Sequence, residues 1–149
     1  NEDEWDIVMD VNIKAVWLVT KHCTPHLLAS DRGATIVNSA SVSGINGTKA
    51  GIAYGASKAG LNALSQSLAR ALAPQRVIVL CIAPGWVATD MAEDHLSGAR
   101  GAEILAQHPL GRVATADEVA RAAVFCALDA PEAMTGAILD LNGASYVRT

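Results

Sequence analysis

The stretch from Ser41 to Lys58 constrains the fold of this chain more than any other, because two opposite hydrophobic patterns flank it. The apolar run 34–37 precedes it, which is typical of a short buried strand. An alanine- and leucine-rich pattern over 56–71 follows it, with leucines three to four residues apart, as on one face of a helix. The sequence therefore predicts a strand, a glycine-rich loop and a helix, with polar side chains at the joints.

Two further apolar runs extend this pattern. The segments 77–82 and 137–141 are short and apolar, like the segment 34–40. Buried parallel strands are continuous hydrophobic runs because helices cover both faces of their sheet. We therefore expect an α/β fold in a single domain of residues 1–149. The strand at 34–40 is expected to be central and parallel, and the strand at 137–141 to lie at an edge.

Helical patterns surround these strands. Residues 7–28 are apolar on more than one side, which is typical of a helix buried on both faces. One face is expected to meet the sheet and the other a partner subunit, and Pro25 is expected to kink the helix or end its regular part. Thr115 and Glu118 have the spacing of a capping box, which predicts that a helix begins there. The segment 90–109 is only weakly helical, and a connection of this length is often a lid or binding segment.

The composition excludes several classes of function. A formal net charge of -4 over 149 residues argues against a nucleic-acid-binding surface. No apolar run approaches the roughly 18 residues that span a membrane. The chain is 51% hydrophobic but only 4% aromatic, so aliphatic side chains must build its core. The three cysteines lie in apolar segments and are expected to be buried thiols in a reducing cytoplasm, without a disulfide. They are Cys23, Cys81 and Cys126.

The four histidines do not form a pattern that predicts a metal site. His22 and His26 are four residues apart on the expected helix, but Pro25 lies between them and no third ligand is near in sequence. His95 and His108 have no partner at a ligand spacing, and both are expected to be surface or substrate-lid residues. We therefore expect no metal ion.

Three polar side chains in the central stretch suit proton transfer at an alcohol or carbonyl carbon. Tyr54 and Lys58 are four residues apart, which puts both on one face at the start of a helix. A phenol is a poor base at neutral pH because its unperturbed pKa is about 10, and a neighbouring ammonium favours its ionised form. Lys58 can therefore make Tyr54 a usable general acid/base. Ser41 can hold a substrate oxygen while charge develops on it. A redox reaction would also require a nicotinamide cofactor.

These three residues, written S-x12-Y-x3-K, resemble the catalytic set of the short-chain dehydrogenase/reductase family. Asn12 resembles the family's fourth catalytic residue. Other segments resemble the family's fifth strand, the P-G-x-x-x-T segment after its sixth strand and the approach to its last helix. They are 36–41, 84–89 and 110–120. The resemblance covers essentially the whole chain. Within the family, the segments 54–71 and 83–91 most resemble 3-oxoacyl-carrier-protein reductases, and many sugar- and steroid-acting relatives share that similarity.

The resemblance implies an NAD(P)-dependent oxidoreductase that interconverts a secondary alcohol and a ketone by hydride transfer. Tyr54 is expected to be the general acid/base, and Lys58 to assist it and to hold the nicotinamide ribose. Ser41 is expected to orient the substrate oxygen. Asn12 either binds a water that links to Lys58 or is simply satisfied by a neighbouring backbone group. The residues expected to bind NAD or NADP are Tyr54, Lys58, Pro84, Gly85, Val87 and Thr89.

The resemblance also implies partners for the chain. These are a small-molecule alcohol or ketone and further copies of the same chain, in a homodimer or homotetramer in the cytoplasm. Ser43 and Trp86 are the expected residues of the substrate pocket. Each has an ordinary structural alternative, since Ser43 could be a loop or capping serine and Trp86 a packing residue.

One departure from the family pattern changes the expected fold. The T-G-x3-G-x-G motif and the N-N-A-G segment do not occur in the chain. The resemblance therefore implies the C-terminal portion of a Rossmann-like doubly wound parallel sheet, without the N-terminal phosphate-binding half of roughly 100 residues. Such a chain could instead be an inactive fragment or a dimerising module, because the pyrophosphate would lose its cradle at a helix terminus. Epimerases and dehydratases of the wider superfamily share Y-x3-K, but they have longer C-terminal regions.

Overall fold

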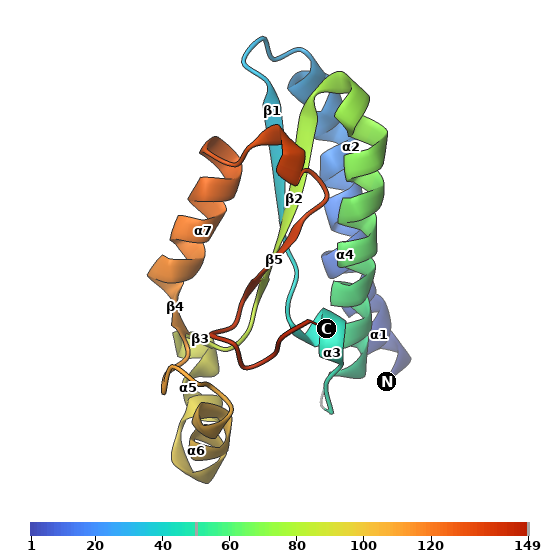
Figure 1. The fold of residues 1–149 in the computed structure, drawn as a ribbon. Helices are drawn as coiled ribbons and strands as arrows, with labels where there is room; N and C mark the ends of the chain where they lie inside the picture. Colours follow the sequence, from blue (N-terminus) through green and yellow to red (C-terminus); the bar gives the residue numbers. More distant parts are fainter. Residues whose placement is uncertain (50, 149) are drawn as a thin grey trace.

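A parallel three-stranded sheet lies at the centre of the structure, a computed structural model that describes residues 1–49 and 51–148 (Figure 1). Its strands lie in the order β1-β2-β5 and are β1 (Ala34–Ser39), β2 (Val77–Pro84) and β5 (Ile138–Leu141). Ala34 pairs with Val77 at the start of the first ladder, and Cys81 pairs with Ile138 at the start of the second. The prediction of parallel strands in an α/β fold is confirmed.

Helices cover both faces of this sheet (Figure 1). The long helices α2 (Ala15–Leu28) and α4 (Ile52–Leu72) pack on one face, and α7 (Ala116–Leu128) packs on the other. The helix that the sequence predicts over 56–71 begins four residues earlier in the structure, at Ile52. None of the helices in the described part of the chain is long and apolar enough to cross a membrane.

The core consists of two clusters, one on each face of β2. Cys81 is fully buried against Leu61 of α4, whereas its neighbour Leu80 is fully buried with Cys126 of α7. Successive side chains of a strand point to opposite faces, so β2 contributes to both clusters in turn. This double burial explains why its sequence is an unbroken apolar run.

The position of β1 differs from the prediction. Within residues 1–49 and 51–148, β1 pairs with β2 alone and lies at an edge of the sheet, so the expected central position is wrong here. Most of its residues are half-buried rather than buried. Its free edge borders a groove that α2 residues such as Val16, Val19 and Leu27 also line.

The N-terminal helical segment begins earlier than the expected Ile7. It comprises α1 (Glu2–Met9), a π-helical segment η1 (Asp10–Lys14) and α2. Asn1 caps it, because its side chain accepts a hydrogen bond from the amide of Glu4 at 2.8 Å. Pro25 does not end the regular part, since α2 continues to Leu28.

The expectation that one face of this segment meets the sheet is confirmed, and the expectation that the other meets a partner subunit stays a prediction. Every residue of α1 and η1 is exposed or half-buried, and Thr20 is the buried residue of α2. The segment contacts α4 and β1, and several of its large apolar side chains are nevertheless exposed. They are Trp5, Ile7, Val11, Trp17, Leu18, Val19 and Leu28.

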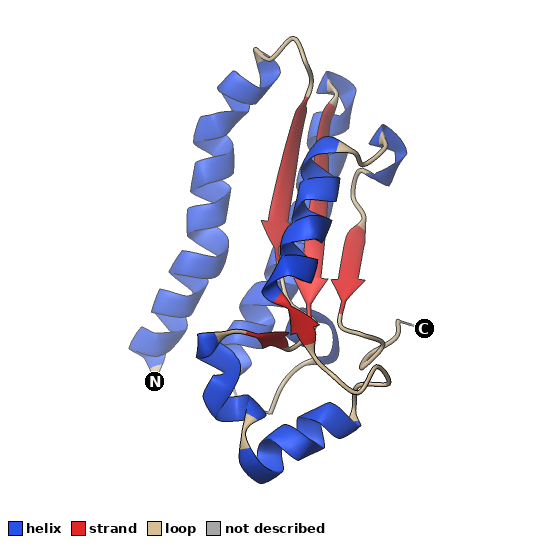
Figure 2. Cartoon of the chain, turned by 90° about the vertical axis from the view of Figure 1, so that its left-hand side faces the viewer, coloured by secondary structure: helices blue, strands red, loops and turns tan. Residues whose placement is uncertain are grey.

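Short elements gather beyond the carboxyl ends of the strands, as Figure 2 shows. They are α3 (Ser43–Asn46), β3 (Val87–Ala88), α5 (Asp90–Leu96), α6 (Gly98–Ala106) and β4 (Ala114–Thr115). The weakly helical segment 90–109 thus contains two helices. Two 3-10 turns, η2 (Ala73–Gln75) and η3 (Glu132–Met134), complete the chain.

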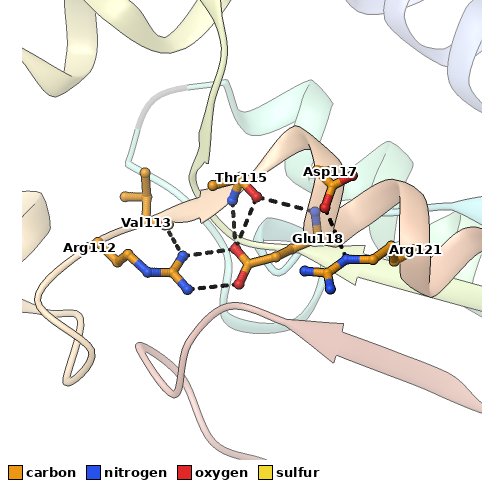
Figure 3. A network of polar contacts seen from close by, with 6 residues as sticks. All are labelled: Arg112, Val113, Thr115, Asp117, Glu118 and Arg121. Carbon is orange, nitrogen blue, oxygen red and sulfur yellow. Dashed lines mark hydrogen bonds and ion pairs between the residues drawn. The ribbon is translucent and has the colours of Figure 1, made fainter.

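The capping box at the start of α7 is confirmed (Figure 3). Thr115 Oγ1 accepts a hydrogen bond from the Glu118 amide at 3.2 Å, and Glu118 Oε2 accepts one from the Thr115 amide at 2.9 Å. Arg112 also donates to both carboxylate oxygens of Glu118, at 2.7 and 2.8 Å. The bonds from Arg112, followed by the bond from the Thr115 amide, lower the pKa of Glu118 to about 2.

The three cysteines are free thiols, but they differ in burial. Cys81 and Cys126 are buried, and burial raises the pKa of both thiols. Cys23 is exposed on α2 beside the free edge of β1, so the expectation that all three are buried is wrong for Cys23.

Candidate active site

The carboxyl ends of the three strands bring their loops to one end of the sheet (Figure 2). The amide of Val42 donates to the carbonyl of Pro84 at 3.0 Å, so the pairing of β1 with β2 continues past the end of β1. The amide of Gly85 donates to the carbonyl of Leu141 at 3.0 Å, which ties the end of β2 to β5. Ligands in open α/β sheets bind outside these strand ends. The candidate residues therefore lie at the end of the sheet where such sites occur.

Tyr54 and Lys58 lie on the first two turns of α4. Lys58 Nζ is 5.6 Å from the centroid of the Tyr54 ring and donates to the backbone carbonyl of Ser39 at 2.9 Å. Burial lowers the pKa of Lys58 below its ordinary value of 10.5, and the nearby Cys81 opposes this effect. The Tyr54 side chain is open to solvent, since the residue is 39% exposed. The sequence-predicted pair is thus brought together, with a partly desolvated ammonium beside an accessible phenol.

Ser41 lies just past the end of β1 and is 8% exposed. Its Oγ accepts a hydrogen bond from the amide of Ser43 at 3.2 Å, which leaves the hydroxyl hydrogen for another acceptor. Ser43 begins α3, which packs on the start of α4. A Cβ added at Gly55 would lie 3.3 Å from the Ser43 carbonyl, and one added at Gly44 would strike the Lys58 backbone. The loop with Ser41 and Ser43 is therefore held directly against the first turns of α4.

Asn12 reaches the same turn of α4 from the N-terminal helical segment. It lies in η1, and single π-helical turns of this kind occur frequently at functional sites. Asn12 Nδ2 donates to Ser57 Oγ at 3.0 Å, and Ser57 Oγ donates to the carbonyl of Tyr54 at 2.8 Å. Ser57 is fully buried and was not among the predicted site residues. A serine inside a helical pattern carries no sequence signal of a partner 45 positions earlier.

A second group of predicted residues follows β2. An added Cβ at Gly85 would lie 2.9 Å from the Asn142 Cβ, so the chain passes too close to the end of β5 for a side chain. Trp86 is half-buried, and its ring centroid lies 5.6 Å from that of His95 on α5. The expectation that His95 belongs to the lid segment is compatible with this contact, which joins the lid segment to the end of β2.

Val87 and Thr89 complete this second group. Val87 pairs with Ala114 in the two-stranded β3–β4 sheet. Thr89 occupies the N-cap position of α5, but its exposed side chain makes no capping hydrogen bond. Thr89 borders an open cavity of about 390 Å³ together with residues of α5. Among the described residues, no hydrogen bond joins the side chains of Trp86 or Thr89 to those of Tyr54 or Lys58, although both groups lie at one end of the sheet.

His108 is not a surface residue, because it is 4% exposed, and its place in the lid segment stays a prediction. Its Nδ1 lies 2.7 Å from the carbonyl of Ile104, and its Nε2 has no hydrogen-bond partner among the described residues. Packing at the end of α6 therefore determines its position. Among residues 1–49 and 51–148, no three His, Cys, Asp or Glu side chains are grouped in a way that could hold a metal ion.

The sequence is similar to those of known proteins along most of its length. The sequence profile of a family described as enoyl-(acyl carrier protein) reductase matches residues 1–143. Similar curated proteins include 3-oxoacyl-[acyl-carrier-protein] reductases from Thermotoga maritima and Escherichia coli, 37% and 36% identical over 146 residues. These matches cover 98% of this chain but 58% and 59% of the relatives. The chain thus spans less than two thirds of the length of the curated relatives it matches.

Solved structures contain the same arrangement of elements. A provisionally assigned 2-deoxy-D-gluconate 3-dehydrogenase from Agrobacterium tumefaciens, with bound NADP, matches with a TM-score of 0.91 and 35% identity. The match covers 97% of this chain and 59% of that one. A short-chain type dehydrogenase/reductase from Mycobacterium ulcerans matches with a TM-score of 0.91 and 27% identity, over 97% of this chain and 53% of that one. The sheet and helices described above therefore have the Rossmann-like arrangement of these enzymes.

Proposed function

Because the chain belongs to the short-chain dehydrogenase/reductase family, we propose that it carries the catalytic residues of an NAD(P)-dependent oxidoreductase. The reaction is the interconversion of a secondary alcohol and a ketone. The observation that carries this proposal is the pairing of Lys58 with Tyr54, with the ammonium 5.6 Å from the centroid of an accessible phenol ring. Its hydrogen bond to the Ser39 carbonyl at 2.9 Å holds the ammonium in this position.

Tyr54 is the general acid/base in this proposal. Its hydroxyl donates a proton to the carbonyl oxygen of the substrate in the reductive direction and removes the alcohol proton in the oxidative direction. A cation beside a phenol favours the phenolate that remains after proton donation. The position of Lys58 therefore supports the role of Tyr54, although Lys58 does not itself contact the transferred proton.

Ser41 orients the oxygen that receives the proton. Its Oγ already accepts a bond from the Ser43 amide, so its own hydrogen is left for a further acceptor such as the substrate oxygen. A donor placed in advance where charge develops on oxygen lowers the barrier without reorganisation. Asn12 supports the same turn of α4 through its amide, which donates to Ser57. Ser43 and Trp86 remain the proposed walls of the substrate pocket.

The residues of both groups fit the nicotinamide end of NAD or NADP. Lys58 has three donors and uses one on the Ser39 carbonyl, so two remain for ribose hydroxyls. The Thr89 hydroxyl is exposed and does not cap α5, and the backbone from Pro84 to Val87 runs beside it. A bound nicotinamide cofactor supplies or accepts the hydride. The bound NADP of the Agrobacterium tumefaciens protein favours NADP as the first cofactor to test.

The substrate class follows from the relatives rather than from the site. The similarity to 3-oxoacyl-[acyl-carrier-protein] reductases makes a 3-oxoacyl thioester the first substrate to assay, and a sugar acid the second. An alternative function is a catalytically inactive module for association. The exposed apolar face of α1, η1 and α2 favours it, because such patches mark interaction sites.

Substitution of Tyr54 tests the proposed function. In the full-length protein, Tyr54→Phe should lower kcat at least about 100-fold, as expected for loss of a general acid/base. The dissociation constant of NADPH should change little, since the ring is kept. Tyr146→Phe is the matched control, because Tyr146 is the other tyrosine of the chain and should leave turnover unchanged. Substantial turnover by Tyr54→Phe would rule out this role. Absence of both turnover and cofactor binding in the unaltered protein would favour the association module.

A further inference from the structure

Ser57 lies at the centre of a short chain of hydrogen bonds beneath the candidate site. It is fully buried, accepts from Asn12 Nδ2 at 3.0 Å and donates to the backbone carbonyl of Tyr54 at 2.8 Å. A serine hydroxyl has one hydrogen, and Ser57 uses it on Tyr54. Asn12 must therefore be the donor in the other bond, which fixes the orientation of its amide. The bonds connect η1 directly to the turn that carries Tyr54.

A second serine of α4 makes the same pair of bonds eight residues later. Ser65 accepts from Asn38 Nδ2 at 2.9 Å and donates to the carbonyl of Leu61 at 2.7 Å. It is also buried, with 2% exposed. The helix α4 is thus attached twice through an asparagine and a serine, once to η1 and once to β1. The two attachments have the same chemistry, and they differ in their distance along α4 from Tyr54.

Serine hydroxyls that bond to a carbonyl one turn earlier are common in helices and say nothing about function by themselves. Ser57 differs because its second bond comes from a π-helical segment and its acceptor is the residue that carries the phenol. Its neighbour in sequence is Lys58, whose position relative to the Tyr54 ring the mechanism requires.

We infer that Ser57 is a positioning residue for the reaction, which holds the first turn of α4 against η1 so that Tyr54 and Lys58 face the substrate together. This inference rests on the proposed function. It assigns Ser57 no contact with substrate or cofactor, because the side chain is closed off from solvent. It also assigns a role to the Asn12 side chain, whose amide donates a hydrogen bond to Ser57 Oγ.

The consequence is a selective loss of turnover when the Ser57 hydroxyl is removed. A displacement of about 1 Å in a reacting group costs up to about 100-fold in rate. Ser57→Ala should therefore lower kcat about tenfold or more while leaving the NADPH dissociation constant within about twofold, because the substitution acts on orientation in the transition state. Ser65→Ala should leave kcat within about twofold of the unaltered protein, although it removes the same two bonds.

The experiment compares Tyr54→Phe, Ser57→Ala and Ser65→Ala in the full-length protein. Measurements are kcat, NADPH dissociation by fluorescence titration, melting temperature and the pH dependence of kcat. We expect similar decreases in melting temperature for both alanine variants. Only Ser57→Ala should lose turnover, and only its pH profile should move, because Lys58 shifts relative to the Tyr54 ring. A purely structural role would change the melting temperature and leave that profile in place.

Equal kcat values for Ser57→Ala and Ser65→Ala would overturn the inference. The proposed function would still stand if Tyr54→Phe has lost its turnover. Retained turnover in Tyr54→Phe would overturn both together. If Ser57→Ala does not fold, Ser57→Cys keeps the size of the side chain and replaces the hydroxyl by a weak donor. Its kcat should fall about threefold or more with an unchanged NADPH dissociation constant. A kcat equal to that of the unaltered protein would overturn the inference.

Discussion

Gly44 provides a sharp test of how the candidate site is built. It lies in the short helix α3, whose backbone packs directly on the backbone of α4 at Lys58. A Cβ at this position would lie 2.5 Å from the Lys58 carbonyl carbon and 2.6 Å from the Ala59 amide nitrogen. Neither atom belongs to a flexible side chain, so a methyl group can fit only if α3 and α4 separate.

The size of the effect follows from these distances. Carbon atoms in contact lie about 3.5–4.0 Å apart, so Gly44→Ala requires a shift of about 1 Å. Overpacking of this kind costs about 1–3 kcal/mol. The higher helix propensity of alanine offsets about 0.5–1 kcal/mol of that cost. The difference is a net loss of up to about 2.5 kcal/mol, which corresponds to a decrease in melting temperature of up to about 10 °C. The same shift moves Lys58 relative to Tyr54 and should lower kcat about 10- to 100-fold.

The assay measures melting temperature and kcat for Gly44→Ala beside Gly60→Ala in the full-length protein. Gly60 lies on α4, two residues after Lys58, and its added Cβ would meet the tip of the Ile13 side chain at 3.0 Å, which can move aside. Gly60→Ala should therefore keep most of its turnover. The reasoning is refuted if Gly44→Ala melts at the same temperature as the unaltered protein and retains its kcat. A loss of stability without loss of turnover would refute only the coupling of α3 to Lys58.

Two further predictions concern charge. Burial lowers the pKa of Lys58, so its charge opposes folding below that pKa, and the opposition fades as pH rises toward 10.5. Lys58→Met should thus melt above the unaltered protein at pH 7, with a difference that shrinks by pH 10, and should lack turnover; a lower melting temperature at pH 7 would contradict this. The pKa of Glu118 is lowered from 4.5 to about 2, so its stabilisation is present above pH 4.5 and lost as pH falls toward 2. The melting temperature of Glu118→Gln should therefore decrease less between pH 6 and pH 2.5 than that of the unaltered protein. Equal decreases in the two proteins would show that the bond from Arg112 to Glu118 does not contribute to acid stability.

The elements with a strong hydrophobic period could be predicted from the sequence. The strands β1, β2 and β5 and the helix α7 lie where their apolar runs and the capping box indicate. The spacing of Tyr54 and Lys58 predicted a helix start near Tyr54, but the apolar pattern over 56–71 did not reveal the first residue of α4, since Ile52 is 74% exposed and lies outside that pattern. Gly51, with a φ of 77°, stands at the N-cap and has no side chain to signal a helix start.

Contacts between distant segments set the remaining limits of prediction. The spacing S-x12-Y-x3-K selected Ser41, Tyr54 and Lys58, because those three belong to one strand, loop and helix. The bond from Asn12 to Ser57 joins two helical segments that no periodicity relates. The π-helical turn around Asn12 also has no sequence signal, since an apolar pattern with a period near 3.6 does not reveal a local widening of the helix. The edge position of β1 depends on which strands are its neighbours, and its own apolar run does not specify them.

The weak local start of α4 explains why so many other elements contact it. No side-chain cap fixes its first turn, yet the proposed chemistry requires Tyr54 and Lys58 to keep their relative position. Three elements supply the missing constraint: β1 through the Ser39 carbonyl, α3 through the backbone contact at Gly44, and η1 through Ser57. Each contact acts on a different atom of the same two turns. The position of the catalytic pair is therefore a property of the tertiary structure, and substitutions outside the S-x12-Y-x3-K pattern can disturb it.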